Sequence, residues 1–135
     1  MTWHSKTDVG IKYGFRSGLE VRVANELKAQ GVSFTYEEQK INYIKPQRES
    51  TYTPDFVIGT LIIETKGRFM VADRQKHILI KNQHPELDIR FVFSNPKQKI
   101  SKSSKTTYAM WCEKHGFLYA KESIPKQWLN EAQQS

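Results

Sequence analysis

The chain contains little of what disulfide frameworks, membrane spans and nucleotide-binding loops require. Cys112 is its single cysteine, which excludes an intrachain disulfide and fits a reducing compartment. No apolar run approaches the length of a membrane span, and the first ten residues lack the apolar core of a signal peptide. No glycine-rich phosphate loop or serine-elbow motif is present. We therefore expect a cytoplasmic protein with no membrane partner and no nucleotide cofactor.

Acidic residues are scarce relative to basic ones. Lys and Arg number 21 against 14 Asp and Glu, which gives a formal net charge of +7. This excess favours a polyanionic partner such as nucleic acid, although a soluble basic protein without such a partner has the same balance. The 135 residues are 38% hydrophobic, which predicts folding rather than disorder. We expect a flexible basic arm over residues 1–14 and one domain over residues 15–135.

The most informative stretch of the chain reads PDFVIGTLIIETK. Two apolar runs, 56–58 and 61–63, flank a Gly-Thr pair that suits a two-residue type II′ hairpin turn, because Gly59 tolerates positive φ. Counting back from that turn places Asp55 opposite Glu64, with Cβ atoms about 4.5–5.5 Å apart. A three-residue turn would move one of the two acids away.

Two facing carboxylates repel each other and need an offsetting charge. Strand alternation places Lys66 on the face of Glu64, so two acids and one lysine converge. The group is compatible with a plain salt-bridge patch at a sheet edge. The surrounding apolar sequence instead indicates burial, where an unneutralised second carboxylate is costly and a divalent cation is the usual remedy.

The first predicted helix carries a third acid. Apolar residues at every fourth position from Phe15 to Leu27 predict a helix that ends near Gly31. Glu20 has two interpretations. With Ser17 it matches a capping box, yet its azimuth lies within or beside the apolar arc, which turns it toward the protein body. Spacing alone favours capping and catalysis equally.

The segment after this helix is predicted to be extended. Alternating apolar residues predict a strand over residues 32–40, with Glu37 and Glu38 in solvent, and residues 41–44 continue it. Residues 45–51 are polar, and they fit either a hairpin loop or a bridge that carries the chain across to another subunit.

The second half of the chain alternates helices and strands. This order predicts the α/β class, with a mixed β-sheet flanked by helices. The predicted elements are a helix from an N-cap at Asp73 to Gln83, a strand over 89–93, a helix from 106 or 107 to 115, a strand over 117–120 and a helix over 125–132.

Two local features of the second half have a structural and a functional interpretation. The polar loop from Ser94 to Lys105 could grip a phosphate backbone, although loops of this kind are more often simply solvated; its lysines are Lys97, Lys99, Lys102 and Lys105. Cys112 and His115 have the spacing of half a zinc site. Because no second pair exists, we interpret them as core packing.

Asp55 followed nine residues later by Glu64-Thr65-Lys66 resembles the PD-(D/E)xK nuclease signature. A larger part of the chain, from about residue 10 to 130, is similar to the bacteriophage endonuclease I family of Holliday-junction resolvases. The similar segments are GFRSGLE at 14–20, YTPDF at 52–56, ETKG at 64–67, KHILI at 76–80, QHPELDIRFVFS at 83–94, CEKHGF at 112–117 and IPKQW at 124–128.

The resemblance implies a restriction-endonuclease-like fold and an intertwined homodimer that acts on branched DNA in an infected bacterial host. It assigns catalysis to Glu20, Asp55, Glu64 and Lys66. In the implied dimer the helix glutamate of one chain meets the hairpin residues of the other, and residues 45–51 form the bridge between subunits.

This chemistry predicts one or two Mg²⁺ ions in each active site, with Mn²⁺ as a substitute. Asp55, Glu64 and the Thr65 carbonyl are assigned to the first ion, and Glu20 with Asp55 to the second. Three basic residues are placed on DNA from charge and location alone: Lys12, Arg16 and Arg68. Two alternatives stay open, a non-catalytic protein that binds branched DNA and a sequence-specific restriction-type endonuclease.

Overall fold

A computed structural model describes residues 17–45 and 48–134 of the chain. Residues 1–16, 46–47 and 135 are outside the described part. The predicted basic arm over residues 1–14, and with it Lys12 and Arg16, therefore lies outside the described residues.

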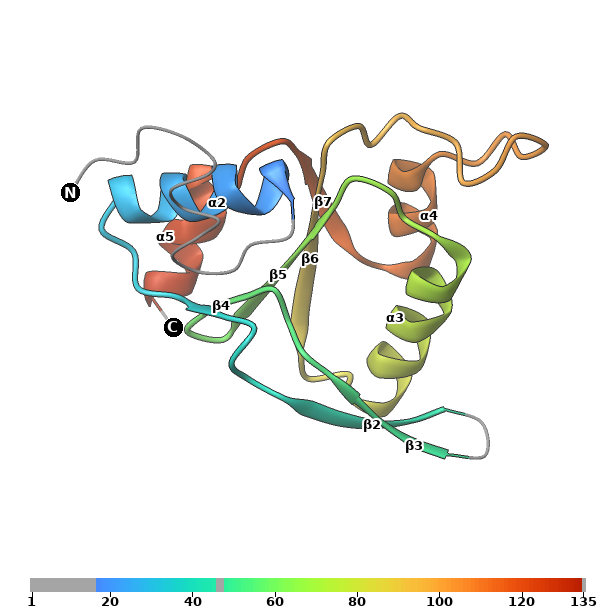
Figure 1. Cartoon of the computed structure of the whole chain (residues 1–135), viewed down its shortest axis with the longest axis horizontal. Coiled ribbons are helices and arrows are strands. Elements are labelled where there is room, and N and C mark those ends of the chain that lie inside the picture. Colours follow the sequence, from blue (N-terminus) through green and yellow to red (C-terminus); the bar gives the residue numbers. More distant parts are fainter. Residues whose placement is uncertain (1–16, 46–47, 135) are drawn as a thin grey trace.

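In the described chain α2 is followed by five strands, after which helices and strands alternate, in the order that the sequence predicts (Figure 1). They are α2 (Gly18–Ala29), β1 (Thr35–Tyr36), β2 (Ile41–Lys45), β3 (Arg48–Tyr52), β4 (Phe56–Ile58), β5 (Leu61–Lys66), α3 (Val71–Gln83), β6 (Asp88–Phe93), α4 (Tyr108–His115), β7 (Leu118–Lys121) and α5 (Lys126–Gln134).

Five strands form one mixed sheet in the order β1-β4-β5-β6-β7. β4 is antiparallel to both β1 and β5, whereas β5, β6 and β7 are parallel. The helices lie on both sides of the sheet, with α2 and α5 on one side and α3 and α4 on the other (Figure 1). The predicted α/β class and the mixed sheet flanked by helices are confirmed.

The central hairpin has the predicted register. Ile58 pairs with Leu61 and Phe56 with Ile63, which leaves a two-residue turn. Gly59 at the first turn position has φ +59°, which a residue with a Cβ adopts only at a cost. The paired ladder ends at Phe56 and Ile63, so the turn also sets the positions of the residues just beyond them at the site.

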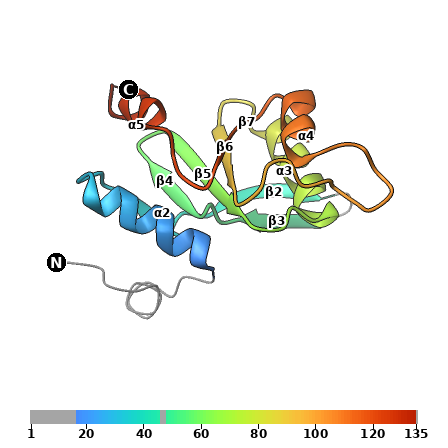
Figure 2. The same cartoon turned by 90° about the horizontal axis from the view of Figure 1, so that it is seen from above.

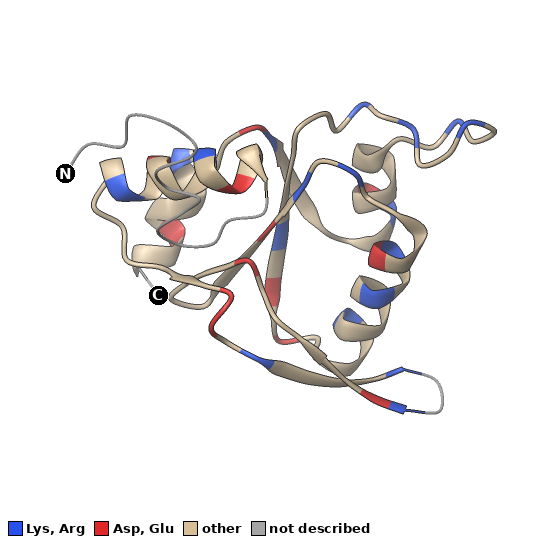
Figure 3. Cartoon of the chain, in the orientation of Figure 1, with Lys and Arg blue, Asp and Glu red and all other residues tan. Residues whose placement is uncertain are grey.

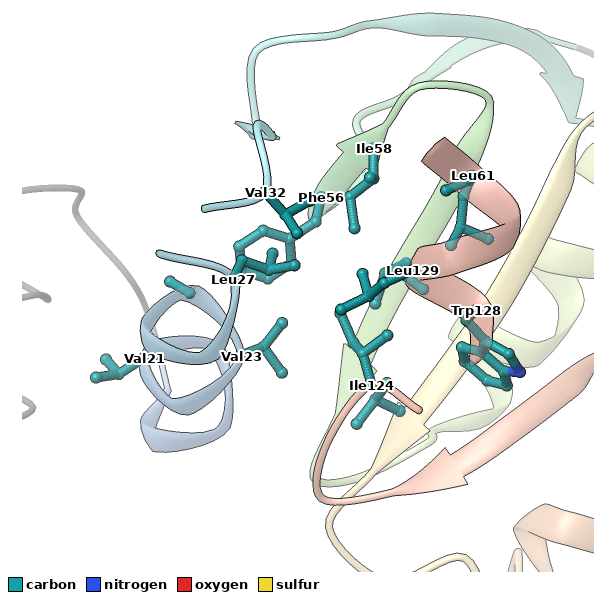
Figure 4. Packing of buried hydrophobic residues seen from close by; sticks show 14 residues of the cluster. Val21, Val23, Leu27, Val32, Phe56, Ile58, Leu61, Ile124, Trp128 and Leu129 are labelled. Carbon is teal, nitrogen blue, oxygen red and sulfur yellow. The ribbon is translucent and has the colours of Figure 1, made fainter. Parts of the chain in front are cut away.

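Two apolar clusters hold the sheet between its helices. In the first, Val23 and Leu27 of α2 and Leu129 of α5 pack around Phe56 (Figure 4). In the second, aromatic rings dominate, with Phe69 within 4.8–5.7 Å of four other ring centroids. Cys112 is fully buried in this cluster, which confirms its interpretation as core packing.

Both ends of α2 follow from the sequence. The Ser17 hydroxyl accepts the backbone N–H of Glu20 at 3.1 Å, so Ser17 is the N-cap. Gly31 has φ +66° directly after the last turn, as the prediction of a glycine cap requires.

Two predictions of local structure are wrong. The expected strand over residues 32–40 shrinks to β1, because Glu37 has φ +51° and breaks the extended backbone. Asp73 is not the N-cap of α3. The helix begins two residues earlier, and the Asp73 carboxylate instead accepts the N–H of Met70 at 3.1 Å.

β2 and β3 pair with each other as a second, two-stranded sheet with Lys45 opposite Arg48. Figures 1 and 2 both place this pair beside α3. The pairing within one chain fits the hairpin alternative for residues 45–51, and the bridge to a second subunit stays a prediction. Within the described ranges, every helix is too short or too polar to cross a bilayer.

Candidate active site

The predicted acids lie where the central hairpin meets α2. Asp55 immediately precedes β4, and Glu64 lies on the paired strand β5. Both side chains are buried, with 4% and 2% of their residue surface exposed. Glu20 of α2 is equally buried at 4%. Burial of three acids costs free energy unless each finds donors or a cation, so their contacts matter.

Thr65, the residue after Glu64 on β5, binds the Asp55 carboxylate. The Oδ2 atom of Asp55 accepts the backbone N–H and the hydroxyl of Thr65, each at 2.9 Å. These bonds orient the carboxylate toward α2, where it meets Glu20. The structure therefore confirms that α2 turns Glu20 toward the protein body.

Carboxylate oxygens of Glu20, Glu37 and Asp55 lie within 4.8 Å of one another. The hydroxyls of Ser17 and Tyr36 both donate to Glu20. Glu20 therefore remains next to its cap residue while it faces the other two acids, so the local and the functional interpretations are compatible.

Glu37 corrects a prediction from the sequence. We expected both Glu37 and Glu38 to be in solvent, and only Glu38 is exposed. The left-handed backbone at Glu37 and its N–H, which donates to the Asp55 carbonyl at 3.1 Å, bring its carboxylate to the cluster. The position of the Glu37 carboxylate depends on tertiary contacts, so the alternation of residues along the predicted strand could not indicate it.

Glu64 is not a member of the cluster formed by Glu20, Glu37 and Asp55, and its carboxylate is bound by other residues. Its Oε2 atom accepts the Tyr52 hydroxyl at 2.8 Å and the Asp55 N–H at 3.0 Å. Its Oε1 atom lies 3.9 Å from Lys66 Nζ and 3.6 Å from His77 Nε2. The predicted approach of Lys66 to Glu64 is confirmed, and Asp55 joins Glu64 to the cluster through its backbone.

Tyr52 and His77 were not singled out from the sequence. Tyr52 is 1% exposed and His77 is fully buried, with the two rings 5.3 Å apart edge to face. Tyr52 lies within the segment YTPDF that carries the family resemblance, which is the one signal that could have drawn attention to it. His77 comes from α3 and lies within the similar segment KHILI, which is the corresponding signal for it, because no local spacing connects it with Glu64.

Burial and mutual repulsion set the charge of the acids. Burial and the nearby Glu64 carboxylate raise the pKa of Asp55 from 3.8 to about 7. Burial alone would raise the pKa of Glu64 as well, but His77, Lys66 and the Asp55 N–H outweigh it and lower the pKa to about 2. Burial lowers the pKa of His77, so its ring is neutral at pH 7. Near neutral pH the Glu64 carboxyl is therefore ionised, while the raised pKa of Asp55 favours its protonated form more than in a free aspartate.

The donor set fits a hard divalent cation. Three carboxylates offer oxygens within 4.8 Å, and oxygen is the ligand that Mg²⁺ and Mn²⁺ prefer. A cation there would compete with the proton that the raised pKa of Asp55 favours. The fit is therefore chemical as well as geometric.

Basic residues follow the site along the chain. Arg68, two positions after Lys66, is exposed, as its predicted role on DNA requires. Figure 3 shows acidic segments at the centre of the sheet, while basic segments continue from the end of β5 and along the loop before α4.

The chain is similar to two phage nucleases and matches one family model. Endonuclease I of Escherichia phage T7 is 49% identical over 118 residues, which cover 87% of this chain and 79% of the relative. Endodeoxyribonuclease 1 of Enterobacteria phage T3 is also 49% identical over 118 residues, which cover 87% of this chain and 78% of the relative. The sequence model described as Phage endonuclease I matches residues 1–135. The chain therefore belongs to the phage endonuclease I family.

Proposed function

We propose that this protein is a divalent-metal-dependent endodeoxyribonuclease that resolves four-way and other branched DNA junctions. The names of its relatives, an endonuclease and an endodeoxyribonuclease, support DNA hydrolysis. The observation that carries the proposal is the buried acid group at the hairpin, with Lys66 beside it. A structural salt bridge would not need three carboxylates within 4.8 Å of one another, two of them buried (Glu20 and Asp55) and one half-buried (Glu37).

The acids divide into two sets that share Asp55. Glu20 and Asp55, with Glu37 beside them, would hold one Mg²⁺ or Mn²⁺ ion. Asp55, Glu64 and the Thr65 carbonyl would hold the other, as the family resemblance implies. A cation in either place would withdraw charge from the scissile phosphate and favour hydroxide over water as the nucleophile.

Two other residues support the acids: Tyr52 positions Glu64, and Lys66 balances negative charge. The Tyr52 hydroxyl fixes one oxygen of Glu64 and leaves the other directed toward Lys66. The Lys66 ammonium, also 3.4 Å from Asp73, supplies positive charge where the phosphate gains negative charge in the transition state. The products would carry 5′-phosphate and 3′-hydroxyl ends.

Two such sites in a homodimer would cut two strands of one junction. The proposal includes the restriction-endonuclease-like fold and the exchange of α2 between subunits through residues 45–51. Within the described chain Glu20 already meets Asp55 of the same subunit, so one chain can also assemble the site. Lys12, Arg16 and Arg68 would hold phosphates, and the enzyme would act in the infected host cell.

A synthetic four-way junction tests this function. With Mg²⁺ we expect paired nicks near the branch point, and with EDTA none. Glu64→Gln, which keeps the side-chain volume and can still accept the Tyr52 hydroxyl, should lower the cleavage rate by about 100-fold or more. Glu86→Gln is the matched control, because Glu86 is exposed and outside the site, and its rate should stay within about twofold of wild type.

The outcomes separate the alternatives. Equal rates for Glu64→Gln and Glu86→Gln would remove Glu64 from the site. Binding without nicking in any divalent ion would indicate a non-catalytic protein that binds branched DNA. Cleavage that depends on the arm sequences would indicate a restriction-type enzyme.

A further inference from the structure

The loop between β6 and α4 presents four positive charges on an ordered backbone. Residues 94–107 contain no acid, and their four lysines are exposed: Lys97, Lys99, Lys102 and Lys105. The loop folds back on itself, because the Ile100 N–H donates to the Thr106 carbonyl and the Tyr108 N–H to the Gln98 carbonyl, both at 2.9 Å. These hydrogen bonds give the loop an ordered backbone, although its polar composition is typical of a solvated loop.

A groove of about 480 Å³ separates this loop from the residues that follow β5. Arg68, Lys99 and Lys102 contribute its positive charge, and Phe69 and Tyr108 are among its apolar residues. None of the described residues that line it is acidic. Since Arg68 is two residues beyond Lys66, the groove begins next to the candidate active site.

The walls of the groove are tied together. The Phe69 N–H donates to the Tyr108 hydroxyl at 3.1 Å, which links the segment after β5 to the start of α4. The Arg74 guanidinium binds the Phe69 carbonyl from α3. The groove therefore keeps its shape without help from a ligand.

The charges of the groove are available to a partner. Lys66 is engaged by Glu64 and Asp73. In the part of the chain that the structure describes, by contrast, no carboxylate lies within 4.0 Å of Arg68 or of any of the four loop lysines. Unpaired cations on an open surface match a solvated polyanion, whereas a site for a small anion would need buried donors.

We propose that this groove and loop bind the phosphate backbone of one duplex arm of the junction, next to the scissile phosphate. The inference rests on the proposed function for the identity of the DNA. Such contacts position the substrate and carry no sequence information. They should therefore add affinity and salt dependence, while the rate of the chemical step depends on the acids and Lys66.

The test compares two double variants that remove the same charge. Lys99→Gln with Lys102→Gln changes the groove, and Lys114→Gln with Lys126→Gln changes exposed lysines at the end of α4 and the start of α5. Binding to a four-way junction is measured in EDTA between 50 and 200 mM KCl. Each lost phosphate contact should reduce the slope of log affinity against log salt by about 0.9. The wild-type affinity should then fall about tenfold more than that of the groove variant across this range.

Single-turnover cleavage in Mg²⁺ over a range of protein concentrations completes the test. The Lys114→Gln with Lys126→Gln control should keep the wild-type rate within about twofold, whereas the groove variant should need a higher protein concentration to reach its maximal rate; cleavage by the groove variant also shows that it is folded. Equal slopes for the two double variants, or no junction binding by the wild type, would overturn the inference. A wild type that binds with the predicted slopes but never cleaves would refute the proposed function and leave the groove assignment standing.

Discussion

Asp55→Asn should make the metal-free protein more stable at alkaline pH, although it should abolish function. The pKa of the Asp55 carboxyl is raised from 3.8 to about 7, first by burial and then by Glu64. At about 1.4 kcal/mol per pKa unit, the folded state opposes ionisation of this group by about 4 kcal/mol. Asparagine removes the charge and can still accept the two hydrogen bonds from Thr65.

The sign of the pH dependence follows from the direction of this pKa difference. Between pH 4 and pH 7 the folded state holds a proton on Asp55 that the unfolded state has lost, so stability falls as pH rises. From pH 5 to pH 8 the wild type should lose about 2.5–3 kcal/mol through this carboxyl alone. The variant lacks that loss, whereas the other titrating groups contribute to both proteins.

Urea denaturation in EDTA at pH 5 and pH 8 measures the difference. The free energy of unfolding of the variant relative to wild type should rise by about 2.5–3 kcal/mol between these two pH values. Excess Mg²⁺ at pH 8 should stabilise the wild type and have little effect on the variant. Parallel pH dependences of the two proteins would refute the assignment of a raised pKa to Asp55 and the reasoning from buried repulsion.

Two other substitutions test the supports of the site. Tyr52→Phe removes the hydroxyl that binds Glu64 and should weaken Mn²⁺ binding, measured by calorimetry, by about 10–100-fold. The control Tyr119→Phe loses a bond to exposed Glu113 and should bind Mn²⁺ as the wild type does. Equal affinities of the two variants would contradict the role of Tyr52 in positioning Glu64. Ser17→Ala removes the N-cap of α2 and should lower the free energy of unfolding, measured by urea denaturation, by about 1 kcal/mol. The control Ser103→Ala, in the exposed loop, should cause no measurable change. An unchanged denaturation midpoint for Ser17→Ala would show that the cap is dispensable.

The parts of the fold that depend on short-range rules could be predicted from the sequence. The hairpin register follows from one glycine between two apolar runs, and the start of α2 follows from Ser17. Strand alternation correctly placed Lys66 with Glu64. Each of these features involves residues that are close in the chain or joined by a tight turn.

The parts of the site that depend on tertiary structure could not be predicted in the same way. Glu37 joins Glu20 and Asp55 because its backbone leaves the β region, and an alternating pattern conceals such a break. His77 reaches Glu64 from the far side of the sheet, where α3 packs. Sequence spacing carries no information about contacts made across a layer of the fold.

The end of β3 has a mechanical consequence for the enzyme. Tyr52 is the last residue of that strand and also the hydroxyl donor to Glu64. The neighbouring strand β2 is clamped to α3, because the Gln83 side chain bonds both backbone groups of Ile44. Displacement of the β2-β3 pair from α3 would therefore move the Tyr52 hydroxyl, which binds the same Glu64 oxygen as the Asp55 N–H, so the docking of β2 and β3 and the position of the Glu64 carboxylate are coupled.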